Sequence, residues 1–296
     1  MDEYYSLIQK LPPPFCTELA GLNPQIAPHV QELRLRTDQP ALFTVKGRLT
    51  PCVKYLPRAA HCQRLTRQAV QDCFLSLCRH SAYAYEDELR QGYFTIPGGS
   101  RVGVAGVRGP AGFACVTSLN LRVARWITCE LPVPVVQALA DLSGGILVAG
   151  VPGSGKTTFL RSMIRYLGQG DHVFCVVDER GELLWCGSAG LPREHAAPCD
   201  VYTQHPKAEA ICMALRCMNP AVIVCDELGT AADAAAVAQG VASGVRFLAS
   251  VHCDTPQGLR QKPQLSHLLR TGAFRQAVFL DGRSAPGTVA QWVELT

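Results

Sequence analysis

The chain has 296 residues, of which 48% are hydrophobic and 18% charged, and its formal net charge is +4 at pH 7. This balance excludes an intrinsically disordered chain, and a net charge this small does not by itself indicate nucleic-acid binding. The longest apolar run, residues 145–151, is too short to cross a membrane, and the start MDEYYSLI lacks the features of a signal peptide. We therefore expect a cytoplasmic protein of two domains.

The fourteen cysteines do not follow a metal-binding pattern. No CxxC pair occurs, and the nearest pairs, Cys73/Cys78 and Cys212/Cys217, are five residues apart, unlike the pairs of a zinc site. In a cytoplasmic protein we expect reduced thiols, several of them serving as small hydrophobic residues inside strands.

The N-terminal part has a mixture of strand and helix patterns. Residues 65–78 place apolar side chains on one helical face, which predicts a helix. Residues 92–107 predict a hairpin that turns at Pro97-Gly98-Gly99-Ser100. Alternating apolar and polar residues predict further strands at 31–36, 41–47 and 117–126. The first domain, residues 1–130, is therefore expected to be a smaller α+β domain.

A proline-flanked segment, ELPVPVVQAL (residues 130–139), follows this part. Because Pro132 and Pro134 hinder a continuous helix or an inner strand, we expect a linker here. The domain boundary is accordingly placed after residue 130.

The remaining residues, 131–296, alternate between strand and helix patterns. Nearly all-apolar runs, which are typical of parallel strands covered on both faces, occur at 145–150, 172–178, 221–226 and 245–251. Helical patterns between them span 157–167, about 207–218 and 231–243. This alternation predicts an α/β domain with a mostly parallel sheet.

The charge is divided unevenly along the chain. Residues 1–129 contain 15 Lys/Arg and 9 Asp/Glu, which gives 15 − 9 = +6, and residues 130–296 contain 13 and 15, which gives 13 − 15 = −2. Two interpretations remain open: an ordinary solvated basic surface, and a basic module that faces the phosphates of a nucleotide or a nucleic acid.

The segment GVPGSGKT (residues 150–157) matches G-x-x-x-x-G-K-[ST] between a predicted strand and a predicted helix. That context is the one in which this motif forms a phosphate-binding loop, with backbone N–H groups around the phosphates, a lysine on the β- and γ-phosphates and a hydroxyl on Mg²⁺. The expected cofactors are a nucleoside triphosphate and Mg²⁺. The residues predicted to bind the nucleotide are Gly150, Val151, Pro152, Gly153, Ser154, Gly155, Lys156, Thr157 and Thr158, of which Thr157 also ligates the metal.

Acidic and basic side chains follow three other predicted strands. Asp226 and Glu227 end AVIVCDE, where Asp226 is the expected second metal ligand, through water, and Glu227 the carboxylate that polarises the attacking water. Such a pair is frequent in P-loop ATPases, and no NKxD guanine signature occurs, so ATP is favoured over GTP. Glu179 and His252 end two more strands and are expected to face the same site, since ligands of open parallel sheets lie beyond the carboxyl ends of strands. Alternatively, Asp226 and Glu227 merely cap the next helix, and Glu179 and His252 are surface polar residues that end their strands.

The order GVPGSGKTT, VVDERGEL, VIVCDELG and SVHCDT resembles the four boxes of the secretion ATPases, the RecA-like motors of type II and type IV secretion and pili. Together with ELRLRTDQPALFTVKGR, IPGGSRVGVAG, LNLRVAR and MNPAVIVCDELGT, it resembles most closely the stage III sporulation AA family, over about residues 28–285. The high cysteine count departs from that pattern.

The resemblance implies a RecA-like P-loop ATPase domain behind the smaller N-terminal domain, a homo-oligomeric ring of six copies, and ATP hydrolysis that powers or assembles a secretion-like channel between mother cell and forespore. The protein would be recruited peripherally to membrane components of that channel on the mother-cell side, with no nucleic acid expected. Glu179 matches the acidic box and His252 the histidine box that senses the γ-phosphate. Arg122 in LNLRVAR is the best match for an arginine that completes a neighbour's site, with Arg101 and Arg125 behind it and Arg180 as the intramolecular rival.

Two other functions remain open. A nucleic-acid translocase or helicase-like ATPase would use the basic N-terminal half, although its aromatic residues do not alternate with Lys/Arg as a base-stacking surface requires. A nucleotide-gated scaffold would hydrolyse ATP slowly or not at all, which the presence of Glu227 disfavours.

Overall fold

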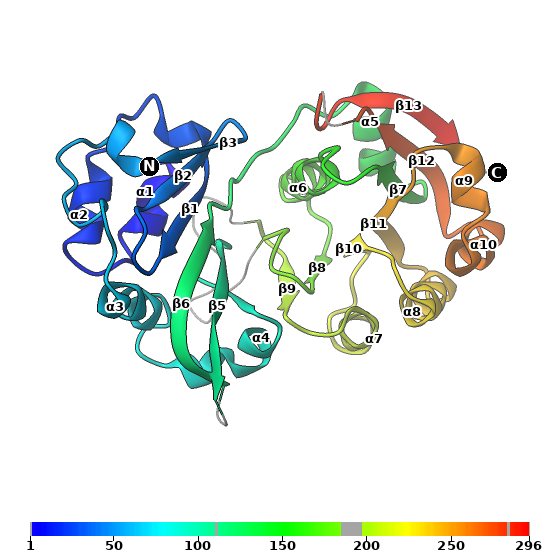
Figure 1. Ribbon diagram of the computed structural model, residues 1–296. Coiled ribbons are helices and arrows are strands. Elements are labelled where there is room, and N and C mark those ends of the chain that lie inside the picture. The colour runs from blue at the N-terminus through cyan, green and yellow to red at the C-terminus, as the bar shows by residue number, and fades with distance from the viewer. Residues whose placement is uncertain (1, 110–111, 185–196, 283–284, 296) are drawn as a thin grey trace. The chain divides into compact units, whose positions relative to one another are not determined.

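The computed structural model describes residues 2–109, 112–184, 197–282 and 285–295 (Figure 1). The chain forms two compact units, Met1–Trp126 and Ile127–Thr296, and each is described by itself.

The first unit is built on a six-stranded antiparallel sheet in the order β3-β2-β1-β6-β5-β4. Its strands are β1 (Val30–Arg36), β2 (Leu42–Val45), β3 (Arg48–Pro51), β4 (Tyr93–Thr95), β5 (Arg101–Gly109) and β6 (Gly112–Arg122). Its helices are α1 (Glu3–Ile8), α2 (Phe15–Ala20), α3 (Arg67–Leu77) and α4 (Glu86–Arg90), with single 3₁₀ turns η1 (Ala27–His29), η2 (Cys52–Lys54) and η3 (Ala82–Tyr85).

The alternation in β1 sorts its side chains onto the two faces of this sheet. Leu33 and Leu35 are fully buried and lie opposite Leu121 and Leu119 of β6, in one core with the buried side of α3. Glu32, Arg34 and Arg36 take the intervening positions and are only partly buried. The helix predicted over 65–78 is α3, which begins after Thr66, whose side chain accepts the N–H of Ala69.

The second unit contains a seven-stranded sheet in the order β13-β12-β7-β11-β10-β8-β9. All its neighbours are parallel except β12 and β13. Its elements are α5 (Val133–Asp141), β7 (Gly145–Gly150), α6 (Lys156–Leu167), β8 (Phe174–Asp178), β9 (Asp200–Thr203), α7 (Lys207–Cys217), β10 (Val222–Glu227), α8 (Ala231–Ala242), β11 (Arg246–His252), α9 (Pro256–Arg260), α10 (Pro263–Arg270), β12 (Phe274–Leu280) and β13 (Val289–Glu294).

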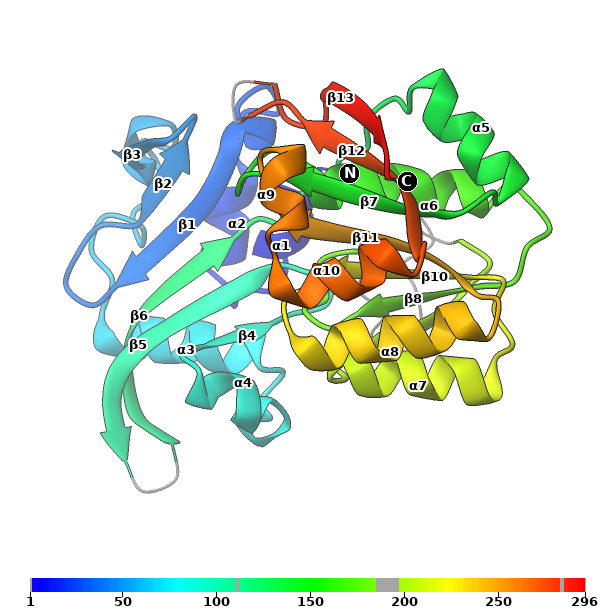
Figure 2. The same cartoon turned by 90° about the vertical axis from the view of Figure 1, so that its right-hand side faces the viewer.

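Helices cover both faces of this sheet. On one face α7, α8 and α10 pack side by side, as Figure 2 shows, and share a core with buried residues of the central strands. On the other face α6 packs on β7, β10 and β11, and α5 lies against α6. Strands enclosed in this way account for the continuous apolar runs in the sequence, and the predicted α/β class with a mostly parallel sheet is confirmed.

The segment predicted as a linker is partly helical. Pro132 precedes α5 as its N-cap residue and Pro134 lies in its first turn, where a helix loses nothing by lacking a backbone N–H. The segment expected to be a linker therefore contains the start of α5, and the helix does not continue back through Pro132. The residues before them also belong to the second unit, because the backbone N–H of Cys129 donates to Oγ of Ser162 on α6 at 2.8 Å. The division between the two units consequently falls between residues 126 and 127, four residues before the predicted boundary.

Within the described part of the chain, no helix has the length and apolar character that crossing a membrane requires.

Candidate nucleotide site

The predicted phosphate-binding loop connects the end of β7 to the start of α6. Gly155 has φ +92°, and a Cβ atom there would lie 2.3 Å from the backbone nitrogen of Gly287. A Cβ atom on Gly150 would lie 2.3 Å from Oγ of Ser154. The backbone contact and the positive φ require glycine at position 155, and a larger residue at position 150 would have to displace the Ser154 hydroxyl.

Lys156 is the first residue of α6 and lies inside the curve of the loop. Its side chain is buried, with Nζ donating to the carbonyl oxygens of Gly150 at 2.9 Å and Val151 at 3.0 Å. Nζ also lies 3.0 Å from Nδ1 of His252 at the end of β11. Burial lowers the pKa of Lys156, and the carboxylate of Glu227 opposes that change. The ammonium is thus held at the mouth of the loop by acceptors that a triphosphate could replace.

The loop fits an anion for two further reasons. The Oγ atom of Ser154 is buried and has no hydrogen-bond partner among the residues that the structure describes, which is costly unless a ligand supplies one. The loop also opens directly onto the first turn of α6, a helix of 12 residues whose N-terminal N–H groups attract negative charge. Thr157 and Thr158 in that turn are half-buried, whereas Val151, Pro152 and Gly153 are exposed.

Asp226 and Glu227 end β10 and contact different partners. The Nζ atom of Lys207 lies 2.6 Å from Oδ1 of Asp226, and it donates to the backbone carbonyl of Glu227 at 2.7 Å. Oε2 of Glu227 lies 3.1 Å from Nε2 of His252 and 3.8 Å from a guanidinium nitrogen of Arg180. Burial raises the pKa of Asp226 to about 6 although the Lys207 ammonium lowers it. Asp226 is therefore an ion-paired carboxylate near neutral pH.

The acidic residues at the end of β8 also differ in their surroundings. Asp178 is fully buried, and its carboxylate accepts the backbone N–H groups of Glu182, Leu183 and Leu184, so it holds the turn that follows the strand. Glu179 points to Lys207, with Oε2 3.3 Å from Nζ.

The strand ends thus bring together Lys156, Glu227 and His252 in one series of contacts, and Glu179 and Asp226 around Lys207. Lys207 is the residue that the sequence analysis missed. A usable signal existed, since lysine in the first turn of a helix is unfavourable for the helix dipole and indicates a negative partner elsewhere.

The three N-terminal arginines have separate environments in the first unit. Arg122, on β6, is 62% exposed, with Nε 4.0 Å from Oε1 of Glu32. The Arg101 guanidinium lies 4.5 Å above the ring of Tyr93. Arg125 is only 17% exposed, pairs with Asp2 and Glu3 and donates to backbone carbonyls, so it stabilises the N-terminal segment. Arg125 is thereby held within its own unit in this structure, and its proposed reserve role towards a neighbour's phosphates stays a prediction.

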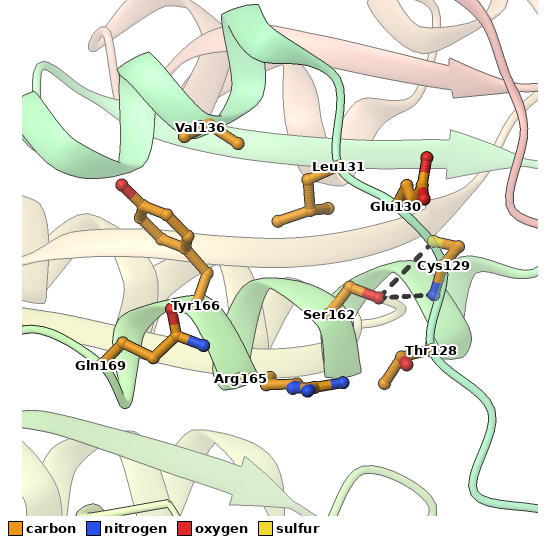
Figure 3. Close-up of a pocket in the computed structure, with 9 residues that line it drawn as sticks. All are labelled: Thr128, Cys129, Glu130, Leu131, Val136, Ser162, Arg165, Tyr166 and Gln169. Atoms are coloured by element: carbon orange, nitrogen blue, oxygen red, sulfur yellow. Dashed lines mark hydrogen bonds between the residues drawn. The ribbon is translucent and has the colours of Figure 1, made fainter.

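A cavity of about 380 Å³ lies between residues 128–131, α5 and α6 (Figure 3). Leu131, Val136 and Tyr166 line its apolar part, and Glu130 and Arg165 lie at its sides. The Ser162 hydroxyl that anchors Cys129 also lies 3.2 Å from the carbonyl of Thr158, so this cavity begins one turn along α6 from the phosphate-binding loop.

Comparison with known proteins shows which family this chain belongs to. The family described as "Sporulation stage III, protein AA" matches residues 22–294. The chain belongs to this family. It is 31% identical over 300 residues to the stage III sporulation protein AA of Bacillus subtilis (strain 168). The aligned region covers 96% of this chain and 93% of that relative.

Among solved structures, two show a similar fold at low sequence identity. The Legionella pneumophila ATPase DotB has a TM-score of 0.56 and 17% identity, over 85% of this chain and 72% of DotB. The pilus retraction motor PilT with bound ADP has a TM-score of 0.56 and 19% identity, over 84% of this chain and 74% of PilT. The predicted fold class, a RecA-like P-loop domain preceded by an α+β domain, is confirmed.

Proposed function

We propose that this sporulation family member is an ATP-hydrolysing ring motor of the secretion ATPase type, which powers or assembles a secretion-like channel during endospore formation. The observation that supports ATP hydrolysis most directly is the series of contacts from the phosphate-binding loop through Lys156 and His252 to Glu227. It couples the group that would bind the β- and γ-phosphates to the carboxylate that would act on water.

In this proposal each residue of the site has a separate role. Residues 150–158 cradle the triphosphate, with Lys156 turning from the loop carbonyls to the phosphates. The Thr157 hydroxyl and, through water, Asp226 would hold Mg²⁺, which neutralises charge on the phosphate oxygens. Glu227 accepts the proton of the attacking water, since its carboxylate is only partly buried and is paired with His252. His252 senses the γ-phosphate through its contact with Lys156, and Glu179 supports the metal side of the site.

The ring is the second part of the proposal. Six copies would assemble so that Arg122 of one subunit reaches the phosphates of the next, and membrane components of the channel would recruit the ring on the mother-cell side. The Arg122 side chain is 62% exposed, which leaves it accessible to a neighbour.

The experiment is ATPase activity as a function of protein concentration, with and without single-stranded DNA, and with the Glu227→Gln variant as the blank. We expect specific activity to rise with concentration, as ring assembly requires, and to be unaffected by DNA. Stimulation by DNA would favour the translocase, and a wild-type rate equal to that of the blank would contradict the proposed hydrolysis.

A further inference from the structure

Lys207 is a buried lysine in contact with acidic residues of two adjacent strands. Its side chain is 5% exposed, and Nζ lies 2.6 Å from Oδ1 of Asp226 and 3.3 Å from Oε2 of Glu179. Asp226 lies in β10 and Glu179 directly follows β8, and these two strands are parallel neighbours. A buried ammonium is tolerated only with such partners, so the position of Lys207 is set by the carboxylates.

Stability alone does not account for this arrangement. Lysine at the start of α7 opposes the helix dipole, and the N-cap residue, Pro206, provides no side-chain cap. Replacing a buried ion pair by apolar residues is often neutral or stabilising, because the desolvation of both charges offsets their attraction. The ion pair therefore calls for a reason in the function of the residues around it.

That reason lies in the shape of β10. The pairing of β10 with β11 is irregular between Cys225 and Glu227, because Asp226 is an extra residue without a partner in β11. Such bulges redirect the side chains that follow them. Lys207 contacts both the bulged residue and the residue that follows it, through the carboxylate of Asp226 and the backbone carbonyl of Glu227.

Fixing the backbone at this point fixes the direction of the next side chain. The Glu227 carboxylate lies 3.1 Å from Nε2 of His252, whose other ring nitrogen lies 3.0 Å from Nζ of Lys156. An unrestrained bulge would let Glu227 rotate out of this series of contacts.

We propose that Lys207 is a positioning residue for ATP hydrolysis: it holds the bulged end of β10 so that the Glu227 carboxylate faces His252 and the phosphate-binding loop. This inference rests on the proposed function. Lys207 itself acts through Glu227 and contacts neither the nucleotide nor the attacking water.

The test is a double-mutant cycle between Lys207→Met and Glu227→Gln. We expect Lys207→Met to lower kcat by about tenfold or more, a part of the 10²–10⁴-fold that a general base contributes. The KM for Mg·ATP, and the Kd of a fluorescent ATP analogue, should stay within about twofold of wild type. In the Glu227→Gln background the same change should lower kcat by less than about threefold, because the group that it positions is already missing. Lys262→Met, a lysine of the same unit outside the site, is the matched control.

A second readout uses the nucleotide-free protein. Lys207→Met leaves Asp226 buried without its partner and should lower Tm by roughly 6 to 20 °C, whereas Lys207→Met with Asp226→Asn should recover at least about half of that loss. Lys207→Arg, which keeps the charge and the donors, should retain more activity than Lys207→Met. If Lys207→Met does not fold, Lys207→Gln takes its place in the cycle.

The outcomes separate the two proposals. If the wild type hydrolyses ATP and Lys207→Met leaves kcat unchanged, only the role of Lys207 is wrong. If the losses of the two single variants multiply in the double variant, Lys207 does not act through Glu227, and the inference is overturned. If the wild type does not hydrolyse ATP while the Tm pattern holds, the ion pair is structural, and the proposed function is overturned together with this inference.

Discussion

Nζ of Lys156 lies 3.0 Å from Nδ1 of His252, and this contact determines which nitrogen of the imidazole holds the proton. An ammonium group only donates, so Nδ1 must accept, and the neutral ring then has its hydrogen on Nε2. That nitrogen lies 3.1 Å from the carboxylate of Glu227, which accepts. One tautomer of His252 thus satisfies both contacts, and a phosphate that attracts Lys156 would release Nδ1.

We predict that Lys156→Ala raises the Kd for Mg·ATP by at least about 100-fold, or ~2.7 kcal/mol, because it removes the ammonium at the mouth of the loop. Isothermal titration calorimetry measures the affinity, and Lys262→Ala is the control. The variant should also unfold at a lower temperature, since Lys156 is buried and bonded to two carbonyls and is not part of an exposed loop surface. Unchanged affinity would show that these residues do not bind a triphosphate.

We predict that Glu227→Gln still binds Mg·ATP but hydrolyses it at least about 100-fold more slowly. The amide oxygen can accept from His252 as the carboxylate does, whereas it cannot take a proton from water. Phosphate release under single-turnover conditions measures the step, and Glu209→Gln on the exposed side of α7 is the matched control. A near-normal rate would shift the role of general base to Glu179.

We predict that Arg122→Ala and Lys156→Ala proteins, each nearly inactive, partly restore activity when mixed. In a mixed ring an intact arginine meets an intact phosphate-binding loop at some interfaces, and an arginine finger contributes about 10³–10⁵ in rate. The ATPase rate is measured against mixing ratio, with co-assembly checked by a tag on one variant, and Arg36→Ala serves as a control from the neighbouring strand. Co-assembly without recovery would favour Arg180, which lies 3.8 Å from Glu227.

We predict that stability declines above about pH 9 because of buried thiols. Burial raises the pKa of Cys73 and Cys175 from 9.0 to about 12, so the unfolded chain releases these protons at a lower pH than the folded one. The stability due to these protonated thiols is full below pH 9 and is lost as the pH rises towards 12, at about 1.4 kcal/mol per pH unit for each thiol. Urea unfolding between pH 8 and 11 measures the slope. Cys175→Ala should make the slope of the unfolding free energy against pH shallower by about 1.4 kcal/mol per pH unit, which corresponds to one proton. An unchanged slope would contradict the raised pKa of Cys175.

Alternation and apolar runs predicted the strands that hold the site, because β7, β8, β10 and β11 are enclosed by helices on both faces. The strands β9, β12 and β13 carried no such signal. Strand β9 has four residues, Arg275 and Gln276 interrupt β12, and β13 is an edge strand with no fully buried position. The proline-rich start of α5 was misread for a different reason, since the effect of a proline depends on its place in the helix.

The position of Lys207 in the first turn of α7 indicated a negative partner, but local patterns could not predict that this partner would be Asp226 and Glu179. The parallel pairing of β8 with β10 brings Asp226 and Glu179 together, and the packing of α7 on β8 brings Lys207 to them. Lys156, Glu227 and His252 were easier to predict, because each ends or follows a strand of the same sheet and the carboxyl ends of those strands share one edge.

The strand order of the second unit has a consequence for how the protein is made. Strand β7, which leads into the phosphate-binding loop, pairs with β11 on one side and β12 on the other, and the loop rests against Gly287. All of these neighbours lie more than 90 residues downstream, so a ribosome synthesises the loop long before it synthesises the walls that give the loop its shape. Nucleotide binding should therefore appear only when nearly the whole chain has left the ribosome, and an interrupted translation product should hold no ATP.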